Sequence, residues 1–152
     1  MSETIFDLIL KNKIPSWPIW EDANYLAFLT PFPNTPGATV VIPKKNPGGD
    51  LFKLSDEKIT GLVMAATKVA KILEVALKVK RVAMVIEGTG VDHAHVKLYP
   101  LHGKLAGETN IWSSHTEFYP EYRGFLSTAE GPKMSDTELN KIQTKIKKAA
   151  KA

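Results

Sequence analysis

A short stretch in which polar and apolar residues strictly alternate constrains the fold of this chain more than any other feature. It covers residues 92–100 and reads Asp-His-Ala-His-Val-Lys-Leu-Tyr-Pro. A period of two is that of a half-buried β-strand, so one face should close a core and the other should carry polar groups. The core face would hold Ala94, Val96 and Leu98, and the opposite face would present His93, His95, Lys97 and Tyr99. Pro100 should end the strand or mark an edge, because proline cannot donate to a sheet ladder.

The row of His93, His95 and Lys97 is suited to chemistry on a phosphate ester. Alternate residues on one face of a strand lie roughly 6.5–7 Å apart, a spacing that suits groups arranged along such an ester. A neutral imidazole can attack phosphorus and form a covalent intermediate, while nearby donors and cations stabilise charge on the phosphoryl oxygens. We predict that His95 is the nucleophile, because polar neighbours flank it on its own face. Lys97 would supply positive charge and, as a like charge, would disfavour protonation of His95.

Two other interpretations of the histidine stretch remain open at this point. An exposed strand face without any task explains an isolated His-x-His equally well. Two histidines on a strand can also share a zinc ion, which then needs a third and a fourth ligand. The candidates are His102, His115, Asp92 and Glu87, and the spacing selects none of them. We therefore expect no metal and no cofactor.

Composition limits the classes of protein to which the chain can belong. Its 152 residues suffice for one ordinary domain, and the absence of cysteine excludes disulfides and thiolate metal sites. No apolar run is as long as a transmembrane helix, and the N-terminus lacks the features of a signal peptide, so we expect a cytoplasmic protein without membrane contact. The net charge of +4 favours anionic ligands, including nucleotides. The only arginines are Arg81 and Arg123, so we do not expect nucleic acid as a partner.

Hydrophobic periodicity and turn residues predict both helices and strands. Helical spacing covers residues 3–14, with Thr4 as N-cap, and a long segment from the N-cap Ser55 to about Lys78. The predicted strands cover residues 19–21, 25–29, 38–43, 81–86 and 92–100, and the one at 81–86 is expected to be buried. Residues 87–90, Glu-Gly-Thr-Gly, should form a tight connection in which two glycines permit a positive φ or a close approach to a ligand.

We expect residues 1–152 to form a single domain with three parts. Residues 3–100 would be the core that carries the histidine stretch. Residues 101–134 are rich in aromatic and turn residues, which predicts an irregular segment that packs over the domain. The capping box Ser-Asp-Thr-Glu at the start of residues 135–151 predicts a lysine-rich C-terminal helix there.

These features together resemble the histidine triad (HIT) superfamily, whose signature is His-φ-His-φ-His-φ-φ with apolar residues at φ. Here the matching segment is His93-Ala94-His95-Val96-Lys97-Leu98-Tyr99, followed by Pro100. The N-terminal half strengthens the resemblance, which covers about residues 3–100. The segments in the typical order and spacing are Ile5-Phe6, Ile14-Pro15-Ser16, Glu21-Asp22, Leu26-Ala27-Phe28-Leu29, Pro36-Gly37 and Val41-Ile42-Pro43-Lys44.

The resemblance implies an α+β fold with an antiparallel sheet of about five strands, one long helix and a C-terminal helix, usually paired into a homodimer. It also implies a nucleotide phosphate hydrolase or nucleotidyltransferase that forms a covalent nucleotidyl-histidine on His95, with His93 near the phosphate. The partner would be a small-molecule nucleotide or another phosphate ester. By position, the nucleotide-binding residues would be Phe6, Ile9, Ile14, Phe28, Thr30 and Thr89. Core packing explains Ile9 and Ile14 equally well.

Three departures from the family pattern favour a second hypothesis. Lys97 stands in place of the third histidine, Thr30 in place of the acidic residue that often holds the ribose, and Ala38 in place of a further histidine. Lysine contacts a phosphate but shuttles protons less readily near neutral pH, and a hydroxyl binds ribose more weakly than a carboxylate. The alternative is a catalytically weak HIT-fold protein that binds a nucleotide or another phosphate compound. The intact pair of His93 and His95 favours the enzyme.

Overall fold

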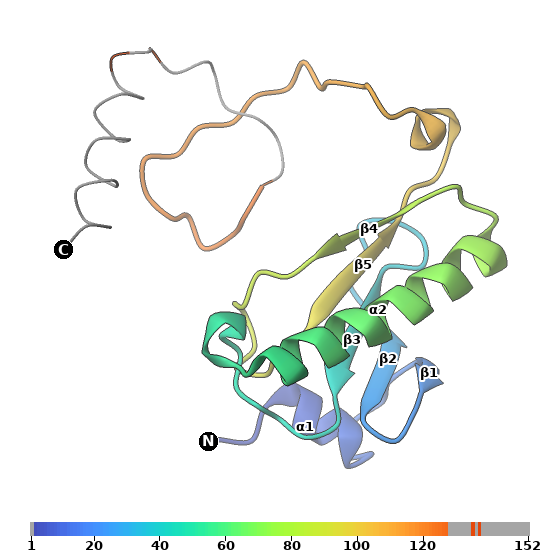
Figure 1. The fold of residues 1–152 in the computed structure, drawn as a ribbon, viewed down its shortest axis with the longest axis vertical. Helices are drawn as coiled ribbons and strands as arrows, with labels where there is room; N and C mark the ends of the chain where they lie inside the picture. The colour runs from blue at the N-terminus through green and yellow to red at the C-terminus, as the bar shows by residue number, and fades with distance from the viewer. Residues whose placement is uncertain (1, 128–134, 136, 138–152) are drawn as a thin grey trace. The chain divides into compact units, whose positions relative to one another are not determined.

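The structure is a computed structural model that describes residues 2–127, 135 and 137, and its fold is shown in Figure 1. The helices are α1 (Ile5–Leu10) and α2 (Asp56–Leu77), with short 3-10 turns η1 (Leu51–Lys53) and η2 (Lys104–Gly107). The strands are β1 (Pro18–Glu21), β2 (Tyr25–Leu29), β3 (Thr39–Pro43), β4 (Val82–Val85) and β5 (Val96–Pro100).

The five strands form one sheet in the order β1-β2-β3-β5-β4, and every neighbouring pair is antiparallel. The expected α+β fold with a five-stranded antiparallel sheet and one long helix is therefore confirmed. The β1–β2 hairpin closes at Asp22, whose carboxylate accepts the backbone N–H groups of Asn24 and Tyr25 at 2.8 Å each. Such an Asx turn is a local property of aspartate, which is why the sequence predicted the turn.

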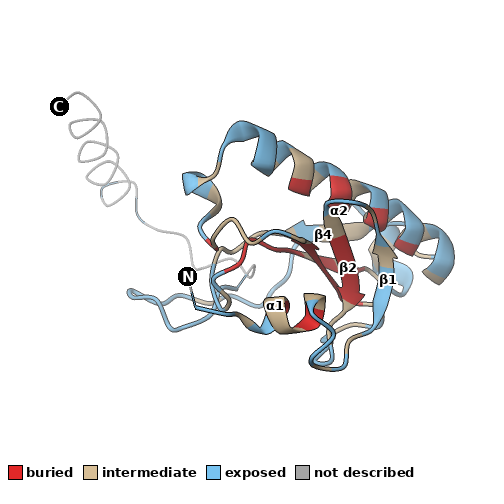
Figure 2. Cartoon of the chain, turned by 90° about the horizontal axis from the view of Figure 1, so that it is seen from below, coloured by how far each residue is buried: buried red, intermediate tan, exposed pale blue. Residues whose placement is uncertain are grey.

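Two cores lie on opposite faces of the sheet, one under each helix (Figure 2). The alternation of β2 and β3 divides their side chains between these cores, because successive residues of a strand face opposite sides. The core under α2 contains Ala27, Val41, Leu62, Ala65, Ala66, Val69, Leu73, Ala94, Val96 and Leu98. The smaller core beside α1 contains Phe6, Ile9, Leu26, Phe28, Val40 and Ile42. The functional candidates lie on the α1 side.

The helix α1 is short, and its N-terminal cap fixes where it begins. Thr4 Oγ1 accepts a hydrogen bond from the Asp7 N–H at 3.2 Å, and the Thr4 N–H donates to Asp7 Oδ2 at 2.8 Å. This capping box satisfies two N–H groups that a helix start would otherwise leave free. At α2 the predicted N-cap Ser55 occupies the cap position but makes no capping hydrogen bond with its side chain.

Three expectations about local structure are wrong. The histidine strand begins at Val96 rather than at residue 92, because residues 92–95 bond to the loop after β3 instead of to a strand. Strand β4 is only partly buried, since it lies at the sheet edge and leaves Met84 39% exposed. The connection from β4 to β5 is not tight but spans residues 86–95, although Gly88 and Gly90 do adopt the expected positive φ of +69° and +86°.

The chain divides into two compact units, with the boundary between residues 109 and 110. The second unit includes the described residues 110–127, 135 and 137. The expectation of one domain over residues 1–152 stays a prediction. Residues 110–127 are irregular, as expected, and the Arg123 guanidinium lies 5.1 Å from the centre of the Tyr119 ring. The predicted helix over residues 135–151 lies almost wholly outside the described residues. No helix in the described part of the chain is long and apolar enough to span a bilayer.

Candidate functional site

A cavity of about 320 Å³ opens on the α1 side of the sheet and gathers the predicted residues of the site. Helix α1, strand β2 and the connection from β4 to β5 supply its walls. Of the residues predicted from the sequence, those that line it are Phe6, Ile9, Ile14, Phe28, Thr30, Thr89, His95 and Lys97. Only His93 among the predicted site residues is absent from the lining. The cavity therefore brings one imidazole and one ammonium together with an apolar chamber.

His95 is held in a single tautomer by the backbone carbonyl of His93. Its Nδ1 lies 2.8 Å from the carbonyl oxygen of His93, and since a carbonyl only accepts, Nδ1 must carry the proton. Nε2 of the neutral ring then bears the lone pair. Burial lowers the pKa of His95 below 6.5; the bond to His93 opposes this shift, Lys97 adds to it, and Glu87 opposes it. His95 is thus neutral at pH 7, which is the state a nucleophile requires.

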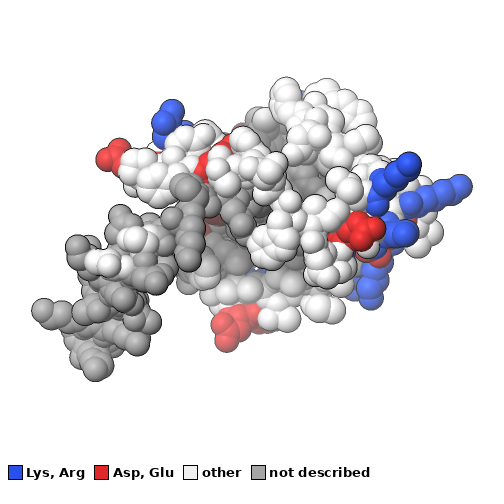
Figure 3. All heavy atoms as spheres, turned by 90° about the horizontal axis from the view of Figure 1, so that it is seen from above, with Lys and Arg blue, Asp and Glu red and all other residues white. Residues whose placement is uncertain are grey.

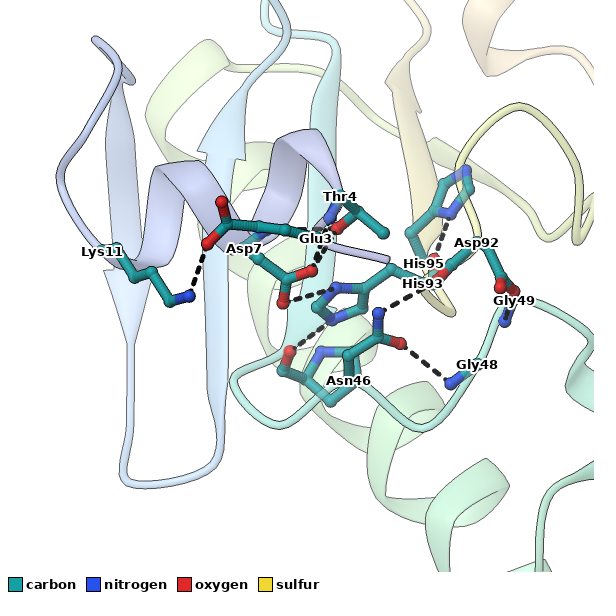
Figure 4. A network of polar contacts seen from close by, with 11 residues as sticks. Glu3, Thr4, Asp7, Lys11, Asn46, Gly48, Gly49, Asp92, His93 and His95 are labelled. Carbon is teal, nitrogen blue, oxygen red and sulfur yellow. Dashed lines mark hydrogen bonds and ion pairs between the residues drawn. The ribbon is translucent and has the colours of Figure 1, made fainter. Parts of the chain in front are cut away.

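His93 is fully buried and does not line the cavity. Its Nε2–H donates to the carbonyl oxygen of Pro43 at 2.7 Å, and its Nδ1 lies 3.9 Å from Asp7 Oδ1 without a hydrogen-bond partner. Burial lowers the pKa of His93, an effect only partly opposed by the bond to Pro43 and by the charge of Asp7. Figure 4 shows the Asp7 carboxylate pointing toward the His93 ring, with Asn46 beside it. His93 contributes to the site through its backbone carbonyl, which holds His95.

Lys97 reaches the cavity as an ion pair rather than as a free cation. Its Nζ lies 2.7 Å from Glu87 Oε2, and both side chains are largely shielded from solvent. The glutamate comes from the connection between β4 and β5, where the sequence predicted only a tight turn at two glycines and one candidate metal ligand. An incoming phosphate would therefore compete with a carboxylate for the ammonium.

The apolar chamber is organised around Phe6. Its ring makes edge-on contacts with Phe28 at 5.7 Å, His93 at 5.6 Å and His95 at 5.3 Å between ring centres. The same side chain thus forms part of the cavity wall and supports both imidazoles. Thr30, which was predicted near a ribose, accepts the Phe32 N–H at 3.2 Å through its hydroxyl oxygen. Its O–H remains the group that can donate to a ligand.

Charged side chains of both signs occur on the surface. On the face seen from above, Figure 3 shows lysine and arginine side chains in separate groups among acidic and uncharged ones. Lys44 pairs with Glu21 at 2.6 Å and Lys11 with Glu3, as Lys97 does with Glu87. Among the described residues no three His, Cys, Asp or Glu side chains gather into a group able to hold a metal ion.

Comparison with known proteins agrees with this geometry. The model of the family described as the HIT domain matches residues 11–103. The chain belongs to this family. The protein named hit from Bacillus subtilis is 30% identical over 120 residues, which cover 76% of this chain and 82% of that protein. An adenosine 5'-monophosphoramidase from Saccharomyces cerevisiae is 31% identical over 116 residues, covering 75% of this chain and 73% of that protein.

Solved structures of HIT family proteins share the fold. A member from Bacillus subtilis aligns with a TM-score of 0.63 and 26% identity, covering 97% of this chain and 96% of the other. A HIT family protein from Bacillus anthracis aligns with a TM-score of 0.61 and 26% identity, covering 95% of both chains. The predicted membership of the superfamily is thereby confirmed.

Sequence reasoning about the HIT motif missed several residues of the site. Trp17 and Phe32, which are 52% and 90% exposed, line the cavity, and they lie within proline-rich links that gave no signal of a site. Asp7 and Asn46 surround His93 from two other segments. A helix-capping aspartate and a loop asparagine have ordinary structural roles, so nothing in their local sequence distinguished them.

Proposed function

We propose that the chain is a nucleotide phosphate hydrolase or nucleotidyltransferase that acts through a covalent nucleotidyl-histidine on His95. The observation that carries this proposal is the fixed tautomer of His95 at the cavity wall. A neutral imidazole with its proton held on Nδ1 offers Nε2 for attack, and burial keeps it unprotonated. The likeness to a relative named as an adenosine 5'-monophosphoramidase supports a nucleotide as substrate.

The chemistry would proceed in two displacements. His95 Nε2 attacks the phosphorus of the nucleotide, a P–N bond forms, and the bond to the leaving group breaks with its electron pair. The Nδ1 proton stays on the ring, which is therefore cationic while the phosphoryl group is attached, and the His93 carbonyl accepts that charged N–H. The leaving group takes its proton from solvent or from the Lys97 ammonium. Water or another hydroxyl then attacks phosphorus, loses its proton, and returns the P–N electrons to Nε2.

The residues that line the cavity support separate positions for the base and for the ribose and phosphate. We assign the apolar chamber, with Phe6, Ile9, Ile14 and Phe28, to the base, because planar rings bind well between aromatic and branched side chains. Thr30 would contact the ribose and Thr89 would lie near the phosphate. Lys97 would bind a phosphoryl oxygen of the substrate once its ion pair with Glu87 has opened.

The experiment that tests the proposal is intact-protein mass spectrometry after rapid mixing with substrate. Adenosine phosphoramidate, a diadenosine polyphosphate and a nucleotide sugar are each mixed with the protein and quenched at alkaline pH, because phosphoramidate bonds break in acid. The wild type should gain the mass of one nucleotidyl group, and the His95→Ala variant should gain none. Turnover that survives in His95→Ala would reject His95 as the nucleophile, and the mass of the adduct would identify the base.

A second candidate is a protein that binds a nucleotide or another phosphate compound with little catalysis. Two contacts favour it: Lys97 is already paired with Glu87, and the Thr30 hydroxyl already accepts a backbone N–H. Measurable nucleotide binding by calorimetry, without adduct or product on the wild type, would select this function.

We further propose that the protein is a cytoplasmic homodimer. Apolar side chains left exposed on α2 and β4 support an interface there: Val75 is 81% exposed, Met64 52% and Met84 39%. Light scattering coupled to size exclusion should give twice the chain mass, and a monomer would reject the dimer. Fractionation of cells should recover the protein with the cytosol.

A further inference from the structure

The segment that carries His95 is positioned by a loop rather than by the sheet. Residues 92–95 precede β5, and segment 43–49 at the end of β3 makes four hydrogen bonds to them. These run from His93 Nε2 to Pro43 O (2.7 Å), from Asn46 Nδ2 to Asp92 O (3.0 Å), from Gly49 N to Asp92 Oδ1 (2.8 Å) and from Ala94 N to Gly48 O (2.7 Å).

Asn46 is the one side chain of this loop that bonds in two directions. Its Oδ1 accepts the Gly48 N–H at 2.8 Å, and its Nδ2 donates to the Asp92 carbonyl at 3.0 Å (Figure 4). The partners settle the orientation of the amide, because a backbone N–H only donates and a carbonyl only accepts. A side chain that bonds both needs a donor and an acceptor on one planar group. Asparagine provides both, whereas aspartate keeps only the acceptor.

The loop and the histidine segment lie in direct backbone contact. A Cβ at Gly49 would lie 3.1 Å from Asp92 Cα and 3.1 Å from the Val91 carbonyl oxygen, so a larger residue would require one backbone to shift by a few tenths of an ångström. Because His95 Nδ1–H donates to the carbonyl of His93, the imidazole is tied to the same segment. A shift of Asp92 or His93 would therefore move the ring of His95.

We propose that Asn46 is a positioning residue for His95, an inference that rests on the proposed role of His95 as nucleophile. Asn46 does not line the cavity of the candidate site, so it would act through what it holds: the Asp92 backbone, and Asp7 beside His93, with which its side chain also forms a hydrogen bond. It lines instead a separate cavity of about 490 Å³, together with Asn24 and Ala94. Its effect should therefore fall on the rate of nucleotidyl transfer and not on the binding of the nucleotide.

The test compares Asn46→Ala and Asn46→Asp with the wild type, and Asn24→Ala is the matched control. Asn24 lines the same cavity as Asn46 but bonds to Asp22 only through its backbone N–H, which alanine retains. The rate of adduct formation at saturating substrate, the Kd of a nucleotide product and the melting temperature are measured for each. Displacing a reacting group by about 1 Å slows a reaction about 100-fold, so we expect a rate loss of about 10- to 100-fold in Asn46→Ala.

The aspartate variant separates positioning from mere loop stability. Asn46→Asp keeps the acceptor for the Gly48 N–H and loses the donor to Asp92, so it should remain slow even where its melting temperature approaches that of the wild type. Nucleotide binding should stay within about two-fold in all three variants. Wild-type rates in Asn46→Asp, or equal rates in Asn46→Ala and Asn24→Ala, would overturn the inference.

A readout independent of turnover keeps the two proposals apart. Nitrogen-15 NMR of the histidine rings reports the tautomer of His95, which should be the Nδ1–H form in the wild type and a mixture in Asn46→Ala. An unchanged tautomer with an unchanged rate overturns the role of Asn46. If the wild type forms no adduct with any substrate, the proposed function fails, and the tautomer alone then decides whether Asn46 positions His95.

Discussion

The buried Nδ1 of His93 and the Oδ1 of Asp7 face each other at 3.9 Å, with the opposite ring nitrogen bonded to Pro43. Asp7 is held in turn by Thr4, whose N–H and hydroxyl both donate to Oδ2 at 2.8 and 2.7 Å. These bonds lower the pKa of Asp7, so the carboxylate stays charged beside the imidazole. Helix α1 is thereby linked to the histidine segment through a polar contact as well as through Phe6.

The stability of the fold should fall on mild acidification. The pKa values of His93 and His95 are both lowered from 6.5, chiefly by burial, so below about pH 6.5 the unfolded chain binds more protons than the folded one. The contribution of these two histidines to the unfolding free energy should be constant above that pH, decrease as the pH falls from about 6.5 toward the lowered folded pKa values, and level off below them. The limiting slope is about 1.4 kcal/mol per pH unit for each histidine. Urea denaturation at a series of pH values measures this decrease in the unfolding free energy. A His95→Gln variant should show a smaller decrease than the wild type. An equal decrease would contradict the lowered pKa of His95.

The charge of Lys97 should shape the pH dependence of turnover. Burial is the main cause of the lowered pKa of His95, and the Lys97 ammonium lowers it further. In Lys97→Gln the acid limb of the kcat/KM profile should therefore move to higher pH, while the wild type keeps its activity below about pH 6.5. A shift in the opposite direction would show that another group controls this limb.

Release of Lys97 from its partner should strengthen phosphate binding. In Glu87→Gln the ammonium loses the carboxylate that lies 2.7 Å away, so a nucleotide no longer has to displace it. We expect the Kd for a nucleotide to decrease a few-fold, corresponding to about 0.5–1 kcal/mol for a partly exposed ion pair. Calorimetry measures this change. Glu21→Gln, which breaks the Lys44 pair outside the cavity, is the control and should leave the Kd unchanged.

Phe6 should affect binding and stability together. Phe6→Leu keeps an apolar side chain in the core but removes the edge-on contacts with Phe28, His93 and His95. The unfolding free energy should fall by about 1–1.5 kcal/mol, and the Kd for a nucleotide should rise several-fold. Phe52→Leu changes a side chain that is 94% exposed and should alter neither. Equal effects of the two variants would contradict the proposal that Phe6 forms part of the nucleotide-binding chamber.

Much of the fold was predictable because its signals are local. The apolar run of β2 lies between an Asx turn and a proline-rich loop, and its predicted bounds match the structure. The alternation of residues 94–98 also holds, since Ala94, Val96 and Leu98 all enter the core under α2. The residues predicted to surround a nucleotide do meet in one cavity, although their roles stay predictions.

What the sequence did not reveal depends on partners distant in the chain. The histidine segment is not part of the strand because it is hydrogen-bonded to the loop at 43–49, more than forty residues earlier in the chain. Likewise Lys97 meets Glu87 only because β4 and β5 pair across an irregular connection. Periodicity reports which face a side chain occupies, but it does not report which group that side chain meets.

The position of Phe6 at the junction of α1, the chamber and both imidazoles limits how this protein can be redesigned. Its ring is at once part of the wall that would select the base and part of the support of the proposed nucleophile. Any exchange that reshapes the chamber from this side also loosens His95, so substrate preference and reactivity cannot be tuned independently through α1. A designer who wishes to change the base alone should begin from the strand side, at Phe28, whose ring touches Phe6 but is not in ring contact with His95 among the described residues.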